Sequence, residues 1–274
     1  MPTVNVNGVE LFYQLSGHAG PPLVLVHGAW WSHRSWEAVA PRLAESFRLL
    51  TYDRRGHSAS EFPPQPWRVH DDVADLAALI EQLELAPAWV GGISSGAAIV
   101  LRLASTRPEL VRGVIVHEPA LFGLLAGDPD VTPVLDSVRE RISAVAARIG
   151  SGDHRGAARQ FVETLIKPGR WDTLSQDYRQ IMVDNAPVFL QGLQDPEVLE
   201  FDLDRIAGFP KPLLLTYGDQ SAPVFRHVVT KIADAVPEAQ VLSFAGAHHV
   251  PQRTHPEDYV DVVTTFVREH ADAS

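Results

Sequence analysis

The chain has 274 residues, of which 45% are hydrophobic and 21% charged, a composition typical of folded globular proteins and unlike that of disordered or fibrous chains. Its 34 acidic residues outnumber 23 basic ones, giving a formal net charge of −11, so we expect no nucleic-acid partner. The absence of cysteine excludes disulfides, thiolate metal sites and a cysteine nucleophile. No leader pattern and no apolar run of membrane-spanning length is present, so we expect a cytoplasmic protein without a membrane partner.

Short β-branched runs alternate with helical patterns over the first 119 residues. Residues 4–13 predict two strands turning at Asn7-Gly8, a dipeptide favoured in tight hairpins. The continuous apolar run at 22–28 is typical of a strand buried on both faces. The pattern then predicts, in order, a helix at 36–47, a strand at 48–53, a helix at 70–85, a strand at 88–93, a helix at 95–105 and a strand at 111–117.

Residues 120–210 interrupt this alternation with helical patterns and no convincing strand. Beyond them the alternation resumes, with strands at 212–218 and 240–245 and helices at 224–235 and 256–270. We therefore predict an α/β protein with a mostly parallel sheet and helices on both faces. Its core domain comprises 1–119 and 211–274, and 120–210 form a helical cap over the carboxyl edge of the sheet, where such proteins bind ligands.

A serine stands at the turn between a predicted strand and a predicted helix. Gly92-Ile93-Ser94-Ser95-Gly96 gives Ser94 glycines at the flanking positions, which a sharp turn requires because its backbone segments pack closely. Such a turn lifts the hydroxyl clear of the sheet, so we expect Ser94 to be a nucleophile. Ser95 lacks flanking glycines at that spacing.

A serine hydroxyl needs a base, and the base needs a carboxylate that fixes its tautomer. The last predicted strand is followed by His248-His249, and the spacing from His249 to the helix beginning near Pro256 favours His249 as the base. We expect His248 to be a loop histidine. No metal site is expected at this pair.

Together these motifs resemble the α/β-hydrolase superfamily over essentially the whole chain. They are His27-Gly28 after a strand, Asp53 to Ser58, the turn at Ser94 and the loop at His249. The resemblance implies an α/β-hydrolase fold with an oxyanion hole formed by the amides of Ser95 and Ala29, or of Trp30 in place of Ala29.

The acid is where this chain departs from the usual pattern. Members usually carry it three residues after the glycine that ends the 212–218 strand, and here that residue is Ser221. The fold also uses the end of the preceding strand, where Glu118 stands. We expect Glu118 to be the acid, with Asp219 as the alternative.

Glu118, the run Ser94 to Ala97 and the stretch 185–192 with Phe189 resemble zearalenone hydrolases, which open a resorcylic-acid macrolactone. Those enzymes lack the His27-Gly28 motif, so this chain resembles a relative of the zearalenone hydrolases. It implies a serine hydrolase that cleaves a hydrophobic or aromatic lactone through a Ser-His-Glu triad and an acyl-enzyme, without a cofactor. The candidate substrate-contacting residues are Trp30, Phe122, Trp171, Met182 and Phe189.

Three alternatives remain open at this point. Cofactor-free dioxygenases and carbon–carbon lyases share the fold and its serine and histidine, and a non-catalytic ligand receptor could retain them too. The expected partner is a small hydrophobic ester or lactone. The sequence leaves a homodimer open.

Overall fold

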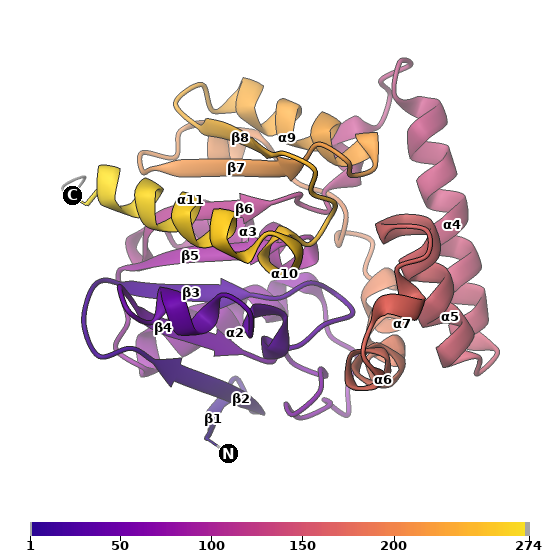
Figure 1. Ribbon diagram of the computed structural model, residues 1–274, viewed down its shortest axis with the longest axis horizontal. Helices are drawn as coiled ribbons and strands as arrows, with labels where there is room; N and C mark the ends of the chain where they lie inside the picture. The colour runs from indigo at the N-terminus through magenta and orange to yellow at the C-terminus, as the bar shows by residue number, and fades with distance from the viewer. Residues whose placement is uncertain (1, 272–274) are drawn as a thin grey trace.

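Eight strands form one sheet in the computed structural model, which describes residues 2–271 (Figure 1). Their order across the sheet is β1-β2-β4-β3-β5-β6-β7-β8. The pairs β1–β2 and β2–β4 are antiparallel, and every later pair is parallel, which confirms the predicted α/β class. The strands are β1 (Thr3–Val6), β2 (Val9–Ser16), β3 (Pro22–Val26), β4 (Arg48–Tyr52), β5 (Ala88–Ile93), β6 (Val111–His117), β7 (Leu213–Gly218) and β8 (Gln240–Phe244).

The first hairpin turns where the sequence predicts. Val6 pairs with Val9, so only Asn7 and Gly8 connect β1 to β2. Their φ angles are 50° and 78°, and the tight turn of a two-residue hairpin needs positive φ at both positions. Asparagine and glycine are the residues that accept this conformation at least cost.

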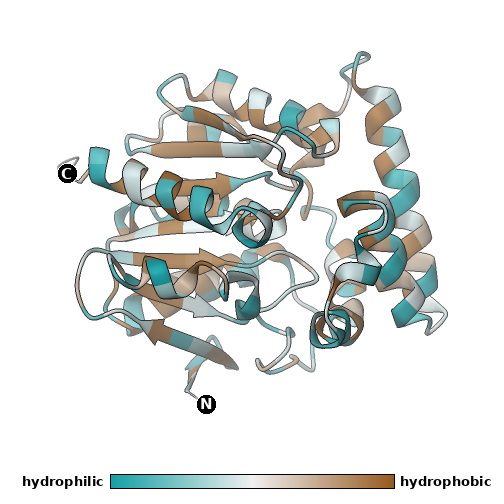
Figure 2. Ribbon diagram, viewed as in Figure 1, coloured by the Kyte–Doolittle hydropathy of each residue, from teal (hydrophilic) through white to brown (hydrophobic). Residues whose placement is uncertain are grey.

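Helices cover both faces of the sheet. Successive residues of β3 point to opposite faces, so Leu23 and Leu25 enter one apolar cluster while Val24 and Val26 enter another. The first cluster contains residues of α1 (Ala40–Leu43) and α11 (Pro256–Glu269), which α10 (Pro251–Thr254) precedes. The second contains residues of α2 (Val69–Gln82), α3 (Ser95–Thr106) and α9 (Pro223–Ala235). Figure 2 shows the resulting concentration of apolar residues in the central strands.

The predicted helix at 36–47 is wrong. In its place stand the short 3₁₀ turn η1 (His33–Trp36) and the one-turn helix α1. Pro41 explains the difference, because proline donates no backbone hydrogen bond and fits only the first turn of a helix. It occupies that place in α1. Trp36 and Leu43 still fill the core beneath this segment.

Helices and turns occupy the chain between β6 and β7. Figure 1 shows α4 to α7 beyond the carboxyl ends of the parallel strands. Several of their buried apolar residues, including Val145, Ala158 and Met182, form a separate cluster with Trp30 and Trp31. The elements are η3 (Phe122–Leu125), α4 (Thr132–Gly150), α5 (His154–Phe161), η4 (Val162–Ile166), η5 (Trp171–Thr173), α6 (Gln176–Asp184), α7 (Ala186–Leu193) and α8 (Asp204–Ala207); η2 (Pro108–Leu110) precedes β6. The division into a core domain and a cap stays a prediction.

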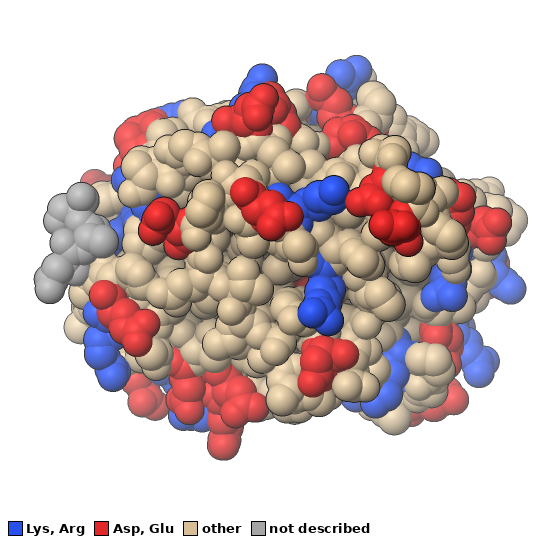
Figure 3. Space-filling view, turned by 90° about the horizontal axis from the view of Figure 1, so that it is seen from above, with Lys and Arg blue, Asp and Glu red and all other residues tan. Residues whose placement is uncertain are grey.

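Acidic and basic side chains are interspersed on the face seen in Figure 3, between broad uncharged areas. Within residues 2–271, no helix combines the length and the apolar character that crossing a membrane requires.

Candidate functional site

Ser94 lies in a strained turn between β5 and α3. Its φ of 58° and ψ of −122° are rarely adopted by a residue with a side chain. The flanking glycines permit this turn. A Cβ on Gly96 would lie 2.3 Å from the carbonyl oxygen of Val26, and one on Gly92 would lie 2.7 Å from the Gly96 backbone. The turn exposes Ser94 at the amino-terminal end of α3, where backbone N–H groups are unpaired.

Glu118 follows the end of β6 and has a positive φ of 46°. It is fully buried. Its backbone N–H donates to Thr216 O, and its Oε1 accepts from the backbone N–H of Gly218 at 2.7 Å. Its Oε2 lies 2.5 Å from Nδ1 of His249. The structure therefore brings together two of the residues that the sequence assigned to one site.

His249 comes from the loop after β8 and is almost completely buried. The ring of Phe225, on α9, stacks on its imidazole with centroids 4.4 Å apart and planes at 20°. His249 and Ser94 line the same cavity. No hydrogen bond joins them among the described residues, and catalytic hydrogen bonds often tighten only when substrate is bound.

Asp219, the alternative acid, makes its side-chain hydrogen bonds to other residues than this histidine. Its Oδ1 accepts from the backbone N–H of Gly246 at 2.8 Å and from the side chain of Gln220 at 3.2 Å. Ser221 stands at the position where relatives of the fold usually carry the acid. Its buried hydroxyl has no hydrogen bond of ordinary geometry, but it contributes to lowering the pKa of Glu118.

The charge on Glu118 is maintained by its neighbours. Burial works to raise the pKa of this carboxyl, but His117, His249 and Ser221 outweigh it, so the pKa lies below its ordinary value. Glu118 is therefore an anion at neutral pH. Its Oε2 accepts a hydrogen bond from the N–H at Nδ1 of His249, which leaves Nε2 free to act as a base.

His117 is a buried neighbour that the sequence did not single out. Its Nδ1 lies 3.0 Å from the Thr216 hydroxyl, and its Nε2 lies 3.6 Å from Glu118 Oε1 without a hydrogen-bond partner. Burial lowers the pKa of His117 to about 4 despite the opposing charge of Glu118, so the ring is neutral at pH 7.

Two buried histidines orient the peptides after β3. His27 Nδ1 contacts the carbonyl of Gly28 at 2.8 Å, while its Nε2 accepts from the backbone N–H of Arg54. His57 Nε2 contacts the carbonyl of Ala29 at 2.9 Å. In a planar trans peptide the N–H points opposite to the carbonyl, so these contacts fix the directions of the N–H groups of Ala29 and Trp30. Burial lowers the pKa of both histidines, that of His57 to about 3.

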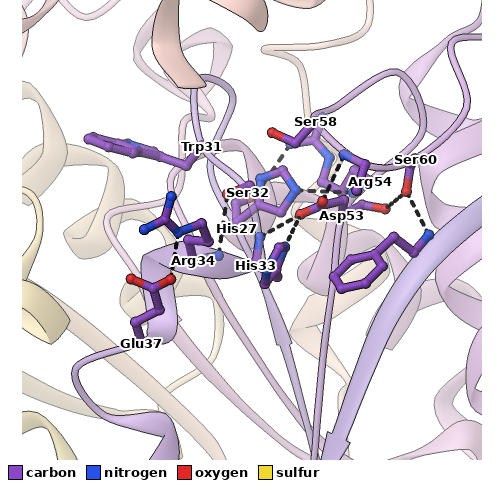
Figure 4. Close-up of polar contacts among 12 residues, drawn as sticks. His27, Trp31, Ser32, His33, Arg34, Glu37, Asp53, Arg54, Ser58 and Ser60 are labelled. Carbon is purple, nitrogen blue, oxygen red and sulfur yellow. Dashed lines mark hydrogen bonds and ion pairs between the residues drawn. The ribbon is translucent and has the colours of Figure 1, made fainter. Parts of the chain in front are cut away.

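The segment that follows β4, around Asp53, holds the loop after β3 in place (Figure 4). The carboxylate of Asp53 accepts from the backbone N–H of His33 and contacts its Nδ1 at 2.8 Å, and it accepts from the N–H of Ala59. Arg54 donates from Nε to Asp72 at 3.0 Å and from Nη1 to the Ser95 hydroxyl at 2.9 Å. Asp72 thus balances the Arg54 charge beside the turn that carries Ser94.

A largely apolar cavity joins these groups. The predicted residues that line it are Ala29, Trp30, Ser94, Ser95, Phe122, Phe189 and His249. Glu118 lies behind His249 and is not a lining residue. Phe161, Leu199 and Phe225 also line the cavity and were not singled out from the sequence.

The sequence also assigned Trp171 and Met182 to the pocket, and this requires correction. Neither is among the residues that line the cavity; both are buried in the apolar cluster of the helical segment. The guanidinium of Arg179 lies over the Trp171 ring, 5.7 Å from its centroid. A helical pattern identifies an apolar face, but the same face can pack on a neighbouring helix or on a ligand.

His117, Glu118 and His249 are also the one group of three histidine or acidic residues, among residues 2–271, whose ligand-type atoms converge, within 4.8 Å of one another. The His249–Glu118 hydrogen bond already uses two of these atoms. Hydrogen bonding therefore accounts for their approach.

Comparison with known proteins identifies the family. The model of the alpha/beta hydrolase fold family matches residues 21–256, so the chain belongs to the α/β-hydrolase family. It is 41% identical to the uncharacterized hydrolase YraK of Bacillus subtilis over 128 residues, which span 46% of this chain and 47% of that protein. It is 27% identical to the pimeloyl-[acyl-carrier protein] methyl ester esterase of Yersinia pseudotuberculosis, covering 95% of this chain and 98% of that one.

The solved structures agree on the fold. The enol-lactonase of Burkholderia xenovorans superposes with a TM-score of 0.78 at 21% identity, covering 97% of this chain and all of that one. At this identity the likeness concerns the fold alone.

Proposed function

We propose that this protein is a cofactor-independent serine hydrolase that cleaves a carboxylic ester, with Ser94 as nucleophile, His249 as base and Glu118 as acid. One observation carries the proposal: the 2.5 Å contact between Glu118 and His249 beside a strained turn that presents Ser94 to the same cavity. The strain supports a functional role, since such backbone conformations persist where the surrounding structure requires them.

In the proposed reaction, His249 Nε2 takes the hydroxyl proton while Ser94 Oγ attacks the ester carbonyl. Glu118 keeps the other imidazole proton on Nδ1 and stabilises the imidazolium. His249 then gives its proton to the departing alkoxide as the carbon–oxygen bond breaks, leaving an acyl group on Ser94. Water attacks this acyl-enzyme by the same route, which releases the carboxylic acid and restores the serine.

The tetrahedral oxyanion needs hydrogen-bond donors already in position. We propose the backbone N–H of Ser95, at the start of α3, and that of Ala29, with Trp30 as the alternative to Ala29. Support comes from the carbonyl contacts of His27 and His57, which hold these peptides in one direction. The neutral state of both histidines keeps these contacts insensitive to pH near neutrality.

The apolar lining favours a hydrophobic ester or lactone as substrate. Aromatic rings of Trp30, Phe122 and Phe189 border the cavity, and they suit an aromatic or alicyclic substrate body. The ester bond named for the Yersinia relative supports ester cleavage. A resorcylic macrolactone of the zearalenone type is the finer substrate proposal, and the helices from 120 to 210 are the proposed cap over the bound molecule.

The test is product analysis with a resorcylic macrolactone and with a short series of aryl esters, beside a Ser94→Ala variant. We expect carboxylic acid products from the native protein only. Oxygen consumption is recorded in parallel with a heteroaromatic substrate of the cofactor-free dioxygenases. Oxygen uptake without ester cleavage would overturn the proposal, as would equal ester cleavage by the Ser94→Ala variant.

A further inference from the structure

A second pocket adjoins the apolar cavity and differs from it in chemistry. It lies between the loop after η4 and the loop that carries the catalytic histidine. Its polar lining consists of Lys167, Arg170, Thr173, His248, Thr254 and His255. Within residues 2–271, no aspartate or glutamate lines it, although acidic residues outnumber basic ones in the chain by 34 to 23.

The positive charges of this pocket are not neutralised by ion pairs. Neither Lys167 nor Arg170 belongs to a salt bridge of the described chain. Burial and then the charge of Lys167 lower the pKa of His248. His248 is therefore a neutral hydrogen-bond donor beside fixed cations.

Two carboxylates outside this pocket hold the backbone of its two loops: Glu163 within η4 and Asp219 directly after β7. Glu163 accepts from the backbone N–H groups of Gly169 and Trp171, at 2.6 and 2.9 Å. Asp219 accepts from the N–H of Gly246. Glu163 thus holds the backbone of the loop that carries Lys167 and Arg170, and Asp219 holds that of the loop before His248. Neither acid pairs with the cationic side chains.

One residue lines both pockets. Ile166, 9% exposed, lines both the apolar cavity and the basic pocket. Val250 also lines the basic pocket, so residues on both sides of His249 in the chain belong to it. A molecule with its ester at Ser94 and an extension past Ile166 would reach the basic pocket with that extension.

We propose that the basic pocket binds an anionic group of the substrate, so that the preferred substrates are amphiphilic esters with an apolar body and one carboxylate or phosphate. This inference rests on the proposed ester hydrolysis and narrows its substrate class. The apolar cavity offers no comparable partner for an anion, because its one arginine, Arg54, is paired with Asp72. Lysine and arginine side chains are suited to carboxylates and phosphates.

The kinetic test compares two aryl esters that differ only at the far end of the acyl chain: an octanoate and the ω-carboxylate half ester of octanedioic acid. The measured quantity is the ratio of kcat/KM for the anionic ester to that for the neutral ester. We expect the double variant Lys167→Gln/Arg170→Gln to lower this ratio about fivefold, the scale of two solvent-exposed ion pairs. The loss should shrink as salt is added, because exposed charges are screened.

A matched control removes the same charge elsewhere. The double variant Arg139→Gln/Arg205→Gln loses two exposed arginines, on α4 and α8, that pair with Asp136 and Asp202. It should leave the ratio unchanged. An equal fall in both double variants would mean a general effect of net charge and would overturn the inference, as would an unchanged ratio in the pocket variant.

A binding measurement keeps this inference separate from the proposed reaction. Titration of the Ser94→Ala protein with inorganic phosphate should shift the ring NMR signals of His248 and His255, and the pocket double variant should abolish the shift. No shift in the parent would overturn the anion site even if esters are hydrolysed. A phosphate shift with an unchanged kinetic ratio would show a site for free anions and overturn the assignment to substrate. Failure of all ester cleavage would instead refute the proposed function.

Discussion

Replacing the carboxylate of Glu118 by an amide should nearly abolish turnover while preserving the fold. In the native protein Oε1 accepts from Gly218 N–H and Oε2 from His249 Nδ1. A glutamine offers one acceptor oxygen and one NH₂ group in the same space. It therefore cannot satisfy both donors, and the imidazole must take the tautomer with its proton on Nε2, which cannot accept the Ser94 proton.

The size of the effect follows from this loss of tautomer and of imidazolium stabilisation. The corresponding change in a serine protease triad lowers kcat by about 10⁴, equivalent to about 5.5 kcal/mol of barrier. We expect Glu118→Gln to lower kcat by about 10³ to 10⁴ with little change in KM.

The assay is initial-rate hydrolysis of an aryl ester, with thermal unfolding as a check on folding. Asp219→Asn is the matched control, because an asparagine oxygen can still accept from Gly246 N–H and this residue does not contact His249. The control should retain near-native turnover. If Asp219→Asn lost activity and Glu118→Gln kept it, the assignment of the acid would be refuted.

Three further predictions concern the buried rings around this site. His117→Met should lower kcat about tenfold, since it removes the polar ring that lies 3.6 Å from the Glu118 carboxylate and favours its charged form; His117→Gln should restore most of it, and equal losses in both variants would indicate packing alone. Phe225→Leu should lower kcat about threefold in steady-state assays, because the stacked ring stabilises the His249 imidazolium; unchanged kcat would contradict this. Below pH 6.5 unfolded His117 binds a proton, whereas the folded residue does so only near pH 4. This contribution to stability is present at pH 7 and lost as the pH falls from about 6.5 to 4. By denaturant titration, unfolding free energy should fall between pH 7 and pH 5 by about 2 kcal/mol more in the native protein than in His117→Gln, and parallel curves would refute the linkage.

Much of the fold could be predicted because local patterns determine it. The hairpin at Asn7-Gly8 needs two positive φ angles. The glycines around Ser94 are needed because backbone atoms lie too close to leave room for a Cβ. The helix predicted at 36–47 was wrong because the apolar spacing of Trp36 and Leu43 suited a helix while Pro41 did not. Apolar periodicity indicates which side chains are buried. A single proline can still prevent the backbone from continuing as a helix.

The candidate site was predictable only where residues follow strand ends. Glu118 follows β6 and His249 lies in the loop after β8, on either side of β7, so both come from the carboxyl edge of the parallel sheet. Phe225 reaches His249 from α9, and no local pattern says which residue of an amphipathic helix faces the site. Trp171 and Met182 show the opposite case, since their apolar character serves packing within the helical segment.

The central claim is that Ser94 forms a covalent acyl-enzyme. The most direct measurement is peptide mass mapping after reaction with an aryl phosphonate, which labels an activated serine by displacing its aryl-oxide leaving group. We expect one phosphonyl group per chain, on the peptide containing Ser94, and none in the Ser94→Ala or His249→Gln variant. A label that persists in Ser94→Ala, on Ser95 or elsewhere, would contradict the account, as would an unlabelled protein that still hydrolyses esters.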